Sequence, residues 1–419
     1  MMKYSILLVL ALAILLSVCA KDNTMEVLDS AYMDINNGDY KKAIEALEKL
    51  LPKEANNQEL NYFLGQAYRG LLFPDGSEIN EVDPQLAEKA SNYFSKVIEI
   101  NPKYAGRRFV VGPYTKIQSI WGSVATTHVD NGDIDAAIAA FVRGKSEGAF
   151  YPAIMEYNRN VMASCDKDAI LFTNGDNDTY PPWYMQLVEE YRKDITIVNL
   201  SLLNVGWYIK QLKNDYPYGT NTLEITMTDD EIDNLKAMKW EERVVKIPVE
   251  PDPENAEGRF EWTVKPTIEG KGLRVQDQMV MEIIRANAWN RPVYFASTVY
   301  NVNKIGLDDY LSLEGLVFRL KPYEQAVSID QMRKNLMNVY QYDGVKDKHV
   351  QYMDEIQSLY KNYRAGFFEL ATHYSEAGEN EKLKNVLTFM KEKLPAVLLP
   401  YTNELMKDAV MKLQEKVEM

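Results

Sequence analysis

The sequence predicts a central α/β domain with a mostly parallel sheet, flanked on both sides by blocks of paired helices. In the middle of the chain, short apolar runs rich in β-branched residues alternate with helical stripes, which is the pattern of β-α-β units. Towards both ends, small residues recur instead at the spacing of helical hairpins. We expect a leader over residues 1–20, helical hairpins over 21–148, the α/β domain over 149–322 and further helices over 323–419.

Composition and charge exclude several classes of protein. The 419 residues are 46% hydrophobic and 26% charged, as in globular proteins, so wholesale disorder and collagen-like architectures are excluded. Lys and Arg number 47 against 61 Asp and Glu, and no stretch gathers the positive charge that a nucleic acid would need. With two cysteines and three scattered histidines, the sequence also contains no Cys/His cluster of the zinc type.

The first twenty residues predict export. A basic start, Met1–Lys3, precedes the apolar run Ile6–Leu16, which has the length of a signal-peptide core and is too short to span a bilayer. The run ends in Leu-Ser-Val-Cys, which resembles the lipobox of bacterial lipoproteins, so that Cys19 would carry a lipid. Alternatives are signal-peptidase cleavage over residues 18–20, with Cys19 discarded, and a retained membrane anchor. We expect a lipoprotein of the bacterial cell envelope, in the periplasm or at the outer membrane, held on a membrane surface.

Helical hairpins are expected before residue 149 and after residue 323. Small residues at regular spacings let paired helices approach closely, and Gly or Asn near the turns ends one helix before the next begins. The marker residues are Gly38, Asp39, Tyr40 and Ala43; Asn61, Leu64, Gly65, Tyr68, Ala90, Phe94, Val97 and Pro102; Trp121, Ala125, Gly132, Asp133, Ala137 and Phe141; and Phe367, Leu370, Ala371, Tyr374, Gly378 and Pro395. The pattern resembles tetratricopeptide repeats, which implies scaffolds that bind an envelope protein or another polypeptide.

The α/β domain follows from the order of its segments. Strands are expected over 169–173, 195–199, 243–249, 260–264 and 292–296, and helices over 182–191, 205–212 and 276–287. In an open, Rossmann-like sheet, ligands bind beyond the carboxyl ends of the strands. The loops that follow the strands ending at Thr173, Asn199 and Ala296 are all polar. We therefore expect a ligand crevice where these loops meet.

The candidate binding residues lie in those loops. They are Asp176, Asn177, Asp178 and Thr179 with the nearby Trp183, then Asn204, and then Ser297. Asp176 and Asp178, two apart after a buried strand, suit a divalent cation if both point outward, and Trp183 could stack on a sugar ring. The alternative is that Asp178 or Thr179 caps the next helix and that Trp183 belongs to the core. The sequence contains no nucleophile elbow, P-loop or dinucleotide-binding fingerprint, and we assign no catalytic residue.

Long motifs in the middle of the chain resemble a known family. The motifs are AILFTNGDNDT over residues 169–179, IVNLSLLN over 197–204, NRPVYFA over 290–296 and LEGL over 313–316. They look like the soluble C-terminal region of bacterial protein O-mannosyltransferase-like membrane proteins, which carries a domain of unknown function. In those transferases, sugar comes from a lipid-linked donor in a multi-pass membrane part, for which we find no counterpart in this sequence.

The resemblance implies an accessory role and carries over no catalytic residue. We therefore expect a non-catalytic binding protein of the envelope. It would bind a ligand, glycan or cation in the crevice and a polypeptide on the helices, and its role would be linked to protein glycosylation. The alternative is a glycan-active enzyme that uses the pair Asp176 and Asp178 for metal binding or for acid/base chemistry.

Overall fold

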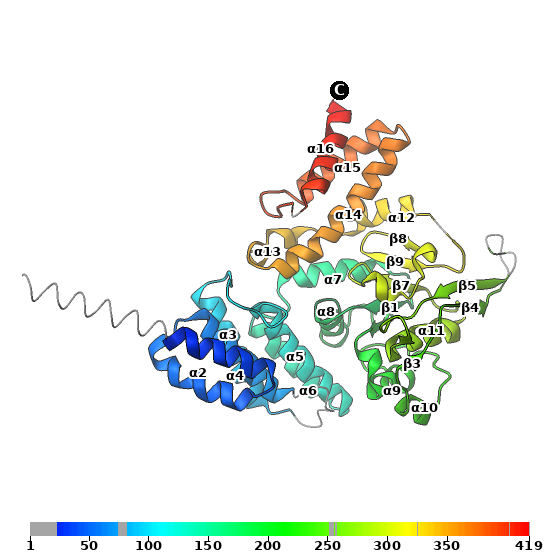
Figure 1. The fold of residues 1–419 in the computed structure, drawn as a ribbon. Coiled ribbons are helices and arrows are strands. Elements are labelled where there is room, and N and C mark those ends of the chain that lie inside the picture. The colour runs from blue at the N-terminus through cyan, green and yellow to red at the C-terminus, as the bar shows by residue number, and fades with distance from the viewer. Residues whose placement is uncertain are drawn as a thin grey trace, which may run out of the picture. The chain divides into compact units, whose positions relative to one another are not determined.

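The structure is a computed structural model that describes residues 23–73, 82–250, 255, 258–324, 326–401 and 403–418. Cys19 and the predicted leader lie outside the described residues. Contacts divide the chain into two compact units, Met1–Asn131 with Val142–Ala149, and Gly132–Phe141 with Phe150–Met419. The chain thus contains a helical part and a larger part built around a sheet, as expected (Figure 1). The domain bounds predicted from the sequence remain predictions.

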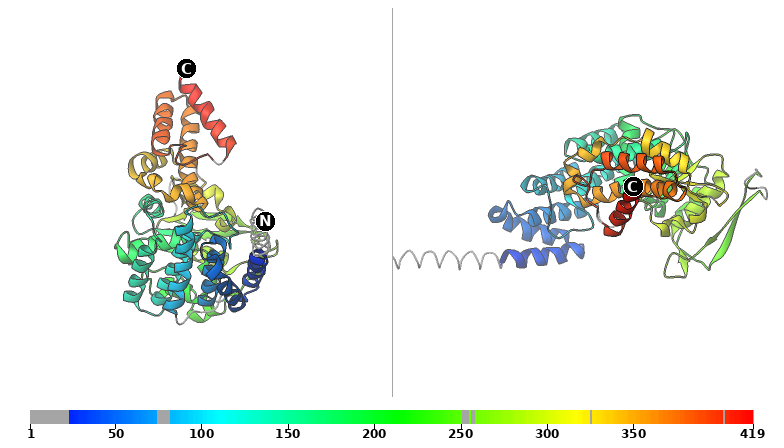
Figure 2. Two further views of the ribbon diagram at one scale, coloured as in Figure 1. Left: turned by 90° about the vertical axis from the view of Figure 1, so that its left-hand side faces the viewer. Right: turned by 90° about the horizontal axis from the view of Figure 1, so that it is seen from above.

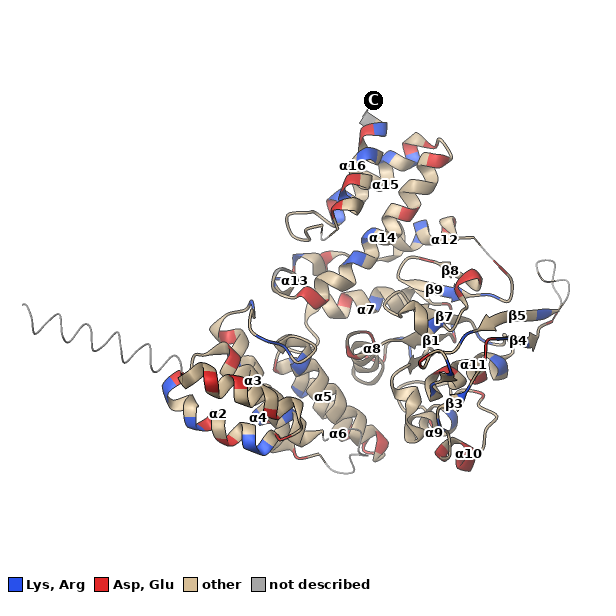
Figure 3. Ribbon diagram, viewed as in Figure 1, with Lys and Arg blue, Asp and Glu red and all other residues tan. Residues whose placement is uncertain are grey.

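The first unit consists of helices. A helix over residues 23–36 is followed by α2 (Tyr40–Glu54), α3 (Gln58–Leu72), α4 (Pro84–Ile100) and α5 (Pro113–Asp130), and α6 (Ile134–Ser146) is shared between the two units. Acidic and basic residues are interspersed along α2 and α4 (Figure 3). Helix α3 packs against both α2 and α4, and a Cβ atom at Gly65 would lie 3.0 Å from the Phe94 ring. Helices α3 and α4 therefore approach closely at Gly65, one of the small marker residues.

The predicted turns between helices have a common geometry. Gly38, Gly132 and Gly378 all adopt positive φ, at 81°, 75° and 71°. After Gly38, the backbone N–H of Asp39 donates to the Asp34 carbonyl at 2.8 Å, and after Gly378 the N–H of Glu379 donates to the Tyr374 carbonyl at 2.9 Å. These bonds satisfy the last carbonyls of the preceding helix, and glycine adopts the left-handed conformation without steric cost.

The second unit is built on a mixed sheet. Its elements up to the end of the sheet are α7 (Pro152–Ser164), β1 (Ile170–Thr173), α8 (Asp176–Val188), β2 (Thr196–Asn199), η1 (Leu202–Asn204), α9 (Gly206–Asn214), α10 (Asp229–Asp233), β3 (Met238–Lys239), β4 (Arg243–Pro248), β5 (Arg259–Val264), β6 (Gly272–Leu273), α11 (Val275–Asn287), β7 (Val293–Ala296), η2 (Asn301–Lys304), η3 (Asp308–Tyr310), β8 (Leu311–Leu313) and β9 (Val317–Leu320). Within the described residues, five strands form the main sheet in the order β2-β1-β7-β9-β8.

The sheet is parallel on one side and antiparallel on the other. Strand β1 pairs in parallel with β2 and with β7, whereas β9 runs antiparallel to β7 and β8 antiparallel to β9. Every residue of β1, β2 and β7 is buried, and Phe172 stacks on Phe295 with ring centroids 4.7 Å apart. Two predicted strands, β4 and β5, pair with each other outside this sheet. The expectation of a mostly parallel sheet therefore holds for β2, β1 and β7, whereas β9 and β8 make the whole sheet mixed.

Helices complete the second unit. They are α12 (Ile329–Lys334), the π-helical turn η4 (Asn335–Val339), η5 (Asp343–Lys346), α13 (His349–Tyr352), α14 (Asp354–Glu376), α15 (Asn380–Lys393) and α16 (Glu404–Glu418). Helices α14, α15 and α16 lie side by side (Figures 1 and 2). Helix α14 packs against α7 of the α/β part, where the rings of Tyr157 and Tyr363 meet edge to face at 5.5 Å. Among the described helices, none is both long and apolar enough to cross a membrane.

Candidate functional site

The loops that follow β1, β2 and β7 meet at one edge of the sheet, as the parallel arrangement requires. The Leu200 N–H donates to the Thr173 carbonyl at 3.0 Å, and the Ser201 hydroxyl lies 3.3 Å from the Asn174 carbonyl. From the loop after β7, the Thr298 hydroxyl donates to the Asp178 carboxylate. We refer to the region formed by residues 174–178, 201–204, 274–277 and 297–303 as the carboxyl edge.

Asp178 faces inward. Its side chain is only 3% exposed, and its two oxygens accept hydrogen bonds from the backbone N–H groups of Asn174 and Gly175 at 2.8 and 2.7 Å. Burial raises the pKa of Asp178, against the opposing effect of the hydrogen bonds from Thr298 and from the backbone. The expectation that Asp176 and Asp178 point outward together is wrong, because α8 already begins at Asp176, and a residue on its first turn folds back over the preceding loop.

The early start of α8 depends on a side chain from α7. Pro181 has no N–H group and so cannot donate to the Asn177 carbonyl four residues earlier. The Asn158 Nδ2 donates to that carbonyl instead, at 2.8 Å. This bond helps the helix to tolerate Pro181, although the sequence predicted the helix start only at residue 182.

The other predicted residues have different environments. Thr179 is buried between Thr173 and Asn199, with oxygen–oxygen and nitrogen–oxygen distances of 2.8 and 2.9 Å. Trp183 is fully buried and stacks on Tyr218 at 4.3 Å, so it belongs to the core and does not face a ligand. Asp176, Asn177 and Ser297 are half-buried, and Asn204 is exposed. In the part of the chain that the structure describes, no group of three or more His, Cys, Asp or Glu side chains could hold a metal ion.

Ser297 connects the carboxyl edge to a buried tyrosine. Its hydroxyl lies 3.2 Å from the Tyr157 hydroxyl, which also accepts a hydrogen bond from the Asn362 Nδ2 at 2.9 Å. Burial raises the pKa of Tyr157 to about 12, so this phenol stays protonated at neutral pH. Ser297 is thus engaged on the protein side of the edge.

Amide side chains form a hydrogen-bonded network along the outer part of the carboxyl edge. The Asn204 Nδ2 donates to the Gln276 Oε1 at 3.0 Å, and the Asn204 Oδ1 accepts from the Gln276 backbone N–H at 3.1 Å. The Asn303 Oδ1 accepts from the Gln276 Nε2 at 3.3 Å and from the Arg274 Nη2 at 3.0 Å. The Asn303 Nδ2 in turn donates to the Asn174 Oδ1 at 3.3 Å. The network joins the loops after β1, β2 and β7 to the first turn of α11.

Sequence reasoning missed four residues of this network, namely Asn174, Arg274, Gln276 and Asn303. Gln276 begins the predicted helix over 276–287 and Arg274 lies two residues before it, so their position where a loop meets a helix was the available signal. Asn303 lies in the short turn η2, where the sequence has neither a helical nor a strand period. Nothing in the sequence alone could have placed Asn303 beside Asn174.

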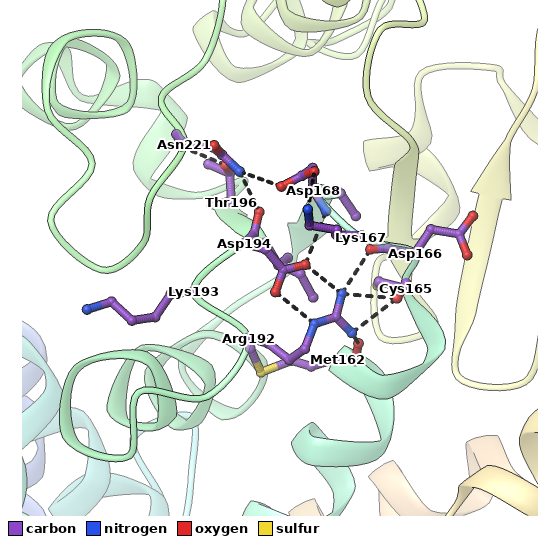
Figure 4. A network of polar contacts seen from close by, with 12 residues as sticks. Met162, Cys165, Asp166, Lys167, Asp168, Arg192, Lys193, Asp194, Thr196 and Asn221 are labelled. Carbon is purple, nitrogen blue, oxygen red and sulfur yellow. Dashed lines mark hydrogen bonds and ion pairs between the residues drawn. The ribbon is translucent and has the colours of Figure 1, made fainter.

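The opposite edge of the sheet contains a second polar network, centred on Arg192 (Figure 4). The guanidinium pairs with Asp194 at 2.9 Å and donates to the carbonyls of Met162, Cys165 and Asp166, at 2.7 to 3.1 Å, in the last turn of α7 and just after it. Although burial acts to raise it, Arg192 holds the pKa of Asp194 below its ordinary value. Because the N–H groups of Arg192 donate to other groups of the protein, this network fixes α7 to the sheet.

The comparison with known families concerns the part of the chain that carries this site. Residues 154–265 and 252–341 match the family model of TMEM260-associated domain 2. Over these residues the chain is similar to a domain related to TMEM260, a protein O-mannosyltransferase-like protein, in agreement with the resemblance of the sequence motifs. The matched residues run from α7 to the end of η4 and leave out the helices before and after them, so the match does not bear on the tetratricopeptide-like repeats. No curated protein matches the chain.

Proposed function

We propose that the protein is an exported accessory protein of the bacterial envelope that binds a polar ligand at the carboxyl edge. The amide network at this edge carries the proposal, because Asn and Gln side chains both donate and accept hydrogen bonds and Ser201 and Asn204 are exposed beside them. In a Rossmann-like arrangement, ligands bind at this edge of the sheet. The similarity to a TMEM260-related domain supports a link to protein glycosylation.

The rest of the chain completes the proposal. The leader directs export, and a lipid on Cys19 holds the protein on a membrane surface. The helical parts act as tetratricopeptide-like scaffolds that bind an envelope protein or another polypeptide; the helix pairs and the glycine turns support this assignment. We propose binding without catalysis, because Asp178 is held by the backbone and by Thr298 and is not available to transfer a proton.

The test compares two asparagines at opposite edges of the sheet. Asn204→Ala removes three side-chain hydrogen bonds at the carboxyl edge, and Asn221→Ala removes two, to Asp168 and Asp194, at the other edge. Both variants and the wild-type chain from residue 21 are titrated calorimetrically with neutral oligosaccharides, sugar phosphates, inorganic phosphate, amino acids and divalent cations. We expect one of these ligand classes to bind, with Asn204→Ala weakening it about tenfold and Asn221→Ala changing it less than about twofold.

Two results would contradict the proposal. One is that no compound of the panel binds to the wild-type protein. The other is that both variants weaken binding equally, which would place the ligand away from the carboxyl edge. Thermal melts of all three proteins serve as the folding control.

A further inference from the structure

We propose that the ligand of the carboxyl edge is a neutral saccharide, and that Tyr300 provides the surface on which a sugar ring lies. This inference rests on the proposed function, since it names the ligand class of the same edge. It depends on three observations: an exposed aromatic ring, the hydrogen-bonding chemistry of the amide network, and the protein contacts that already engage the basic side chains of the carboxyl edge.

Tyr300 is 68% exposed and lies where the loop after β7 turns into η2. In the described part of the chain, the other large hydrophobic side chains with high exposure are Val, Leu or Met, and Tyr300 is the one aromatic among them. A single exposed side chain carries no function by itself. The position of Tyr300 favours a role in binding. Its backbone carbonyl accepts a hydrogen bond from the Asn303 N–H at 2.9 Å, so Tyr300 lies within one turn of a residue of the amide network.

The amides suit hydroxyl groups. A sugar hydroxyl both donates and accepts, and so does each Asn or Gln side chain. The paired bonds between Asn204 and Gln276 and the bond between Asn303 and Asn174 fix the orientation of these groups before any ligand arrives. Within the described residues, the Asn174 Nδ2 has no protein partner and remains available as a donor. Preorganised polar groups bind a polyol with little loss of conformational freedom.

The charges of the edge favour a neutral ligand over an anion. Arg274 is engaged by the buried Asp277 through its Nε and Nη2, at 2.9 and 2.8 Å, and also donates to Asn303. Lys304 is only 4% exposed, lies 3.7 Å from the centre of the Phe318 ring and donates to Asn301. Because both cations are already engaged by the protein, they offer little positive charge to a phosphate or a carboxylate.

The experiment uses the chain from residue 21 and three tyrosine variants. Tyr300→Ala removes the ring and Tyr300→Phe keeps it, while Tyr323→Ala removes a half-exposed ring that follows β9 at the opposite edge of the sheet. Each protein is titrated with neutral hexose and N-acetylhexosamine oligosaccharides, with glucose 1-phosphate and with inorganic phosphate. We expect a neutral oligosaccharide to bind about five- to tenfold more weakly to Tyr300→Ala, and within about twofold of wild type to the other two variants.

The outcomes separate this inference from the proposed function. If a saccharide binds and Asn204→Ala weakens it while Tyr300→Ala does not, the role of Tyr300 is wrong and the proposed function stands. If phosphate or glucose 1-phosphate binds and neutral sugars do not, the ligand class is wrong. If no ligand binds, both proposals fail. Because Tyr300 is exposed, thermal melts of the variants should match that of wild type, which excludes misfolding as the cause of a loss.

Discussion

Asp178 fixes the first turn of α8 in place. Its carboxylate accepts hydrogen bonds from the backbone of Asn174 and Gly175 and from the Thr298 hydroxyl, so it joins the loops after β1 and β7. An asparagine offers one acceptor oxygen and turns an NH₂ group towards one of these donors. We therefore expect Asp178→Asn to lower the free energy of unfolding by about 1 to 3 kcal/mol at pH 7, and Asp176→Asn by less than about 0.5 kcal/mol, measured by urea denaturation.

The contribution of Asp178 to the free energy of unfolding should depend on pH in a definite direction. Burial raises the pKa of Asp178, so the folded protein holds this proton more tightly than the unfolded chain does. The stability that this group contributes is fully present below its ordinary pKa and is lost as the pH rises through the folded value. The difference in unfolding free energy between wild type and Asp178→Asn should therefore be larger at low pH than at pH 7. Equal stability of the two proteins at every pH would show that the carboxylate does not hold the turn.

At this scale, the sequence could name the residue types of the site but not their orientation. It placed Asp178, Asn204 and Ser297 in the segments that follow β1, β2 and β7, because a buried strand fixes where the next segment begins. It could not tell that Asp178 is a buried hydrogen-bond acceptor, since a capping and a ligand-binding carboxylate have the same local sequence. It did not single out Tyr300 at all, because one tyrosine in an unpatterned turn carries no periodic signal.

Helix α3 shows how two glycines allow close packing between helices. A Cβ atom at Gly65 would lie 3.0 Å from the Phe94 ring of α4, and one at Gly70 would overlap the Tyr40 ring at the start of α2. Alanine normally stabilises a helix by about 1 kcal/mol relative to glycine. A small shift of Phe94 relieves the contact at Gly65, whereas the overlap at Gly70 requires Tyr40 to leave its position.

We expect Gly70→Ala to destabilise the first unit by about 1 to 3 kcal/mol, and Gly65→Ala to change its stability by less than about 1 kcal/mol. In a Tyr40→Ala background, Gly70→Ala should become stabilising, because the clash is gone and the helix propensity remains. Hydrogen exchange of the α3 amides measures both effects within this unit. A Gly70→Ala cost that is the same with and without Tyr40 would contradict the packing described here.

The elements themselves were largely predictable, and their pairing was not. Each predicted strand is present within a residue or two, because runs of buried β-branched and aromatic residues are unambiguous when turns bound them. The hairpin of β4 and β5 has the same local signature as a strand of the main sheet, so its separation could not be foreseen. Strands β8 and β9 were missed because Ser312 and Arg319 interrupt apolar runs that are only three and four residues long.

At the scale of the whole molecule, Asn160 links the beginning and the end of the part that matches TMEM260-associated domain 2. The matched residues end at Gln341, whose backbone N–H donates to the Asn160 Oδ1 at 3.0 Å and whose carbonyl accepts from the Asn160 Nδ2 at 2.7 Å. The same Nδ2 also donates to the Tyr363 hydroxyl of α14 at 2.7 Å. Helix α14 lies outside the match, yet it covers buried groups inside it.

This arrangement predicts how fragments of the chain should fold. A fragment of residues 150–341 contains the matched part but lacks α14, so the side of α7 that carries Tyr157 and Asn160 would be exposed to water. A fragment of residues 132–419 keeps α14 and the whole second unit, including the contact of Phe141 with Phe150 at 5.6 Å. We expect the longer fragment to melt cooperatively, as followed by circular dichroism.

The shorter fragment should melt over a broad range and bind a dye for exposed apolar surface, because loss of a packed helix leaves buried side chains and hydrogen-bonding groups without partners. Replacing Tyr363 by Phe in the longer fragment is the matched control, since it removes only the hydrogen bond to Asn160 and should cost about 1 kcal/mol. A cooperative transition of the 150–341 fragment within a few degrees of the longer one would mean that the matched part is stable by itself. The C-terminal helices would then be an attached module, free to bind a polypeptide without affecting the sheet.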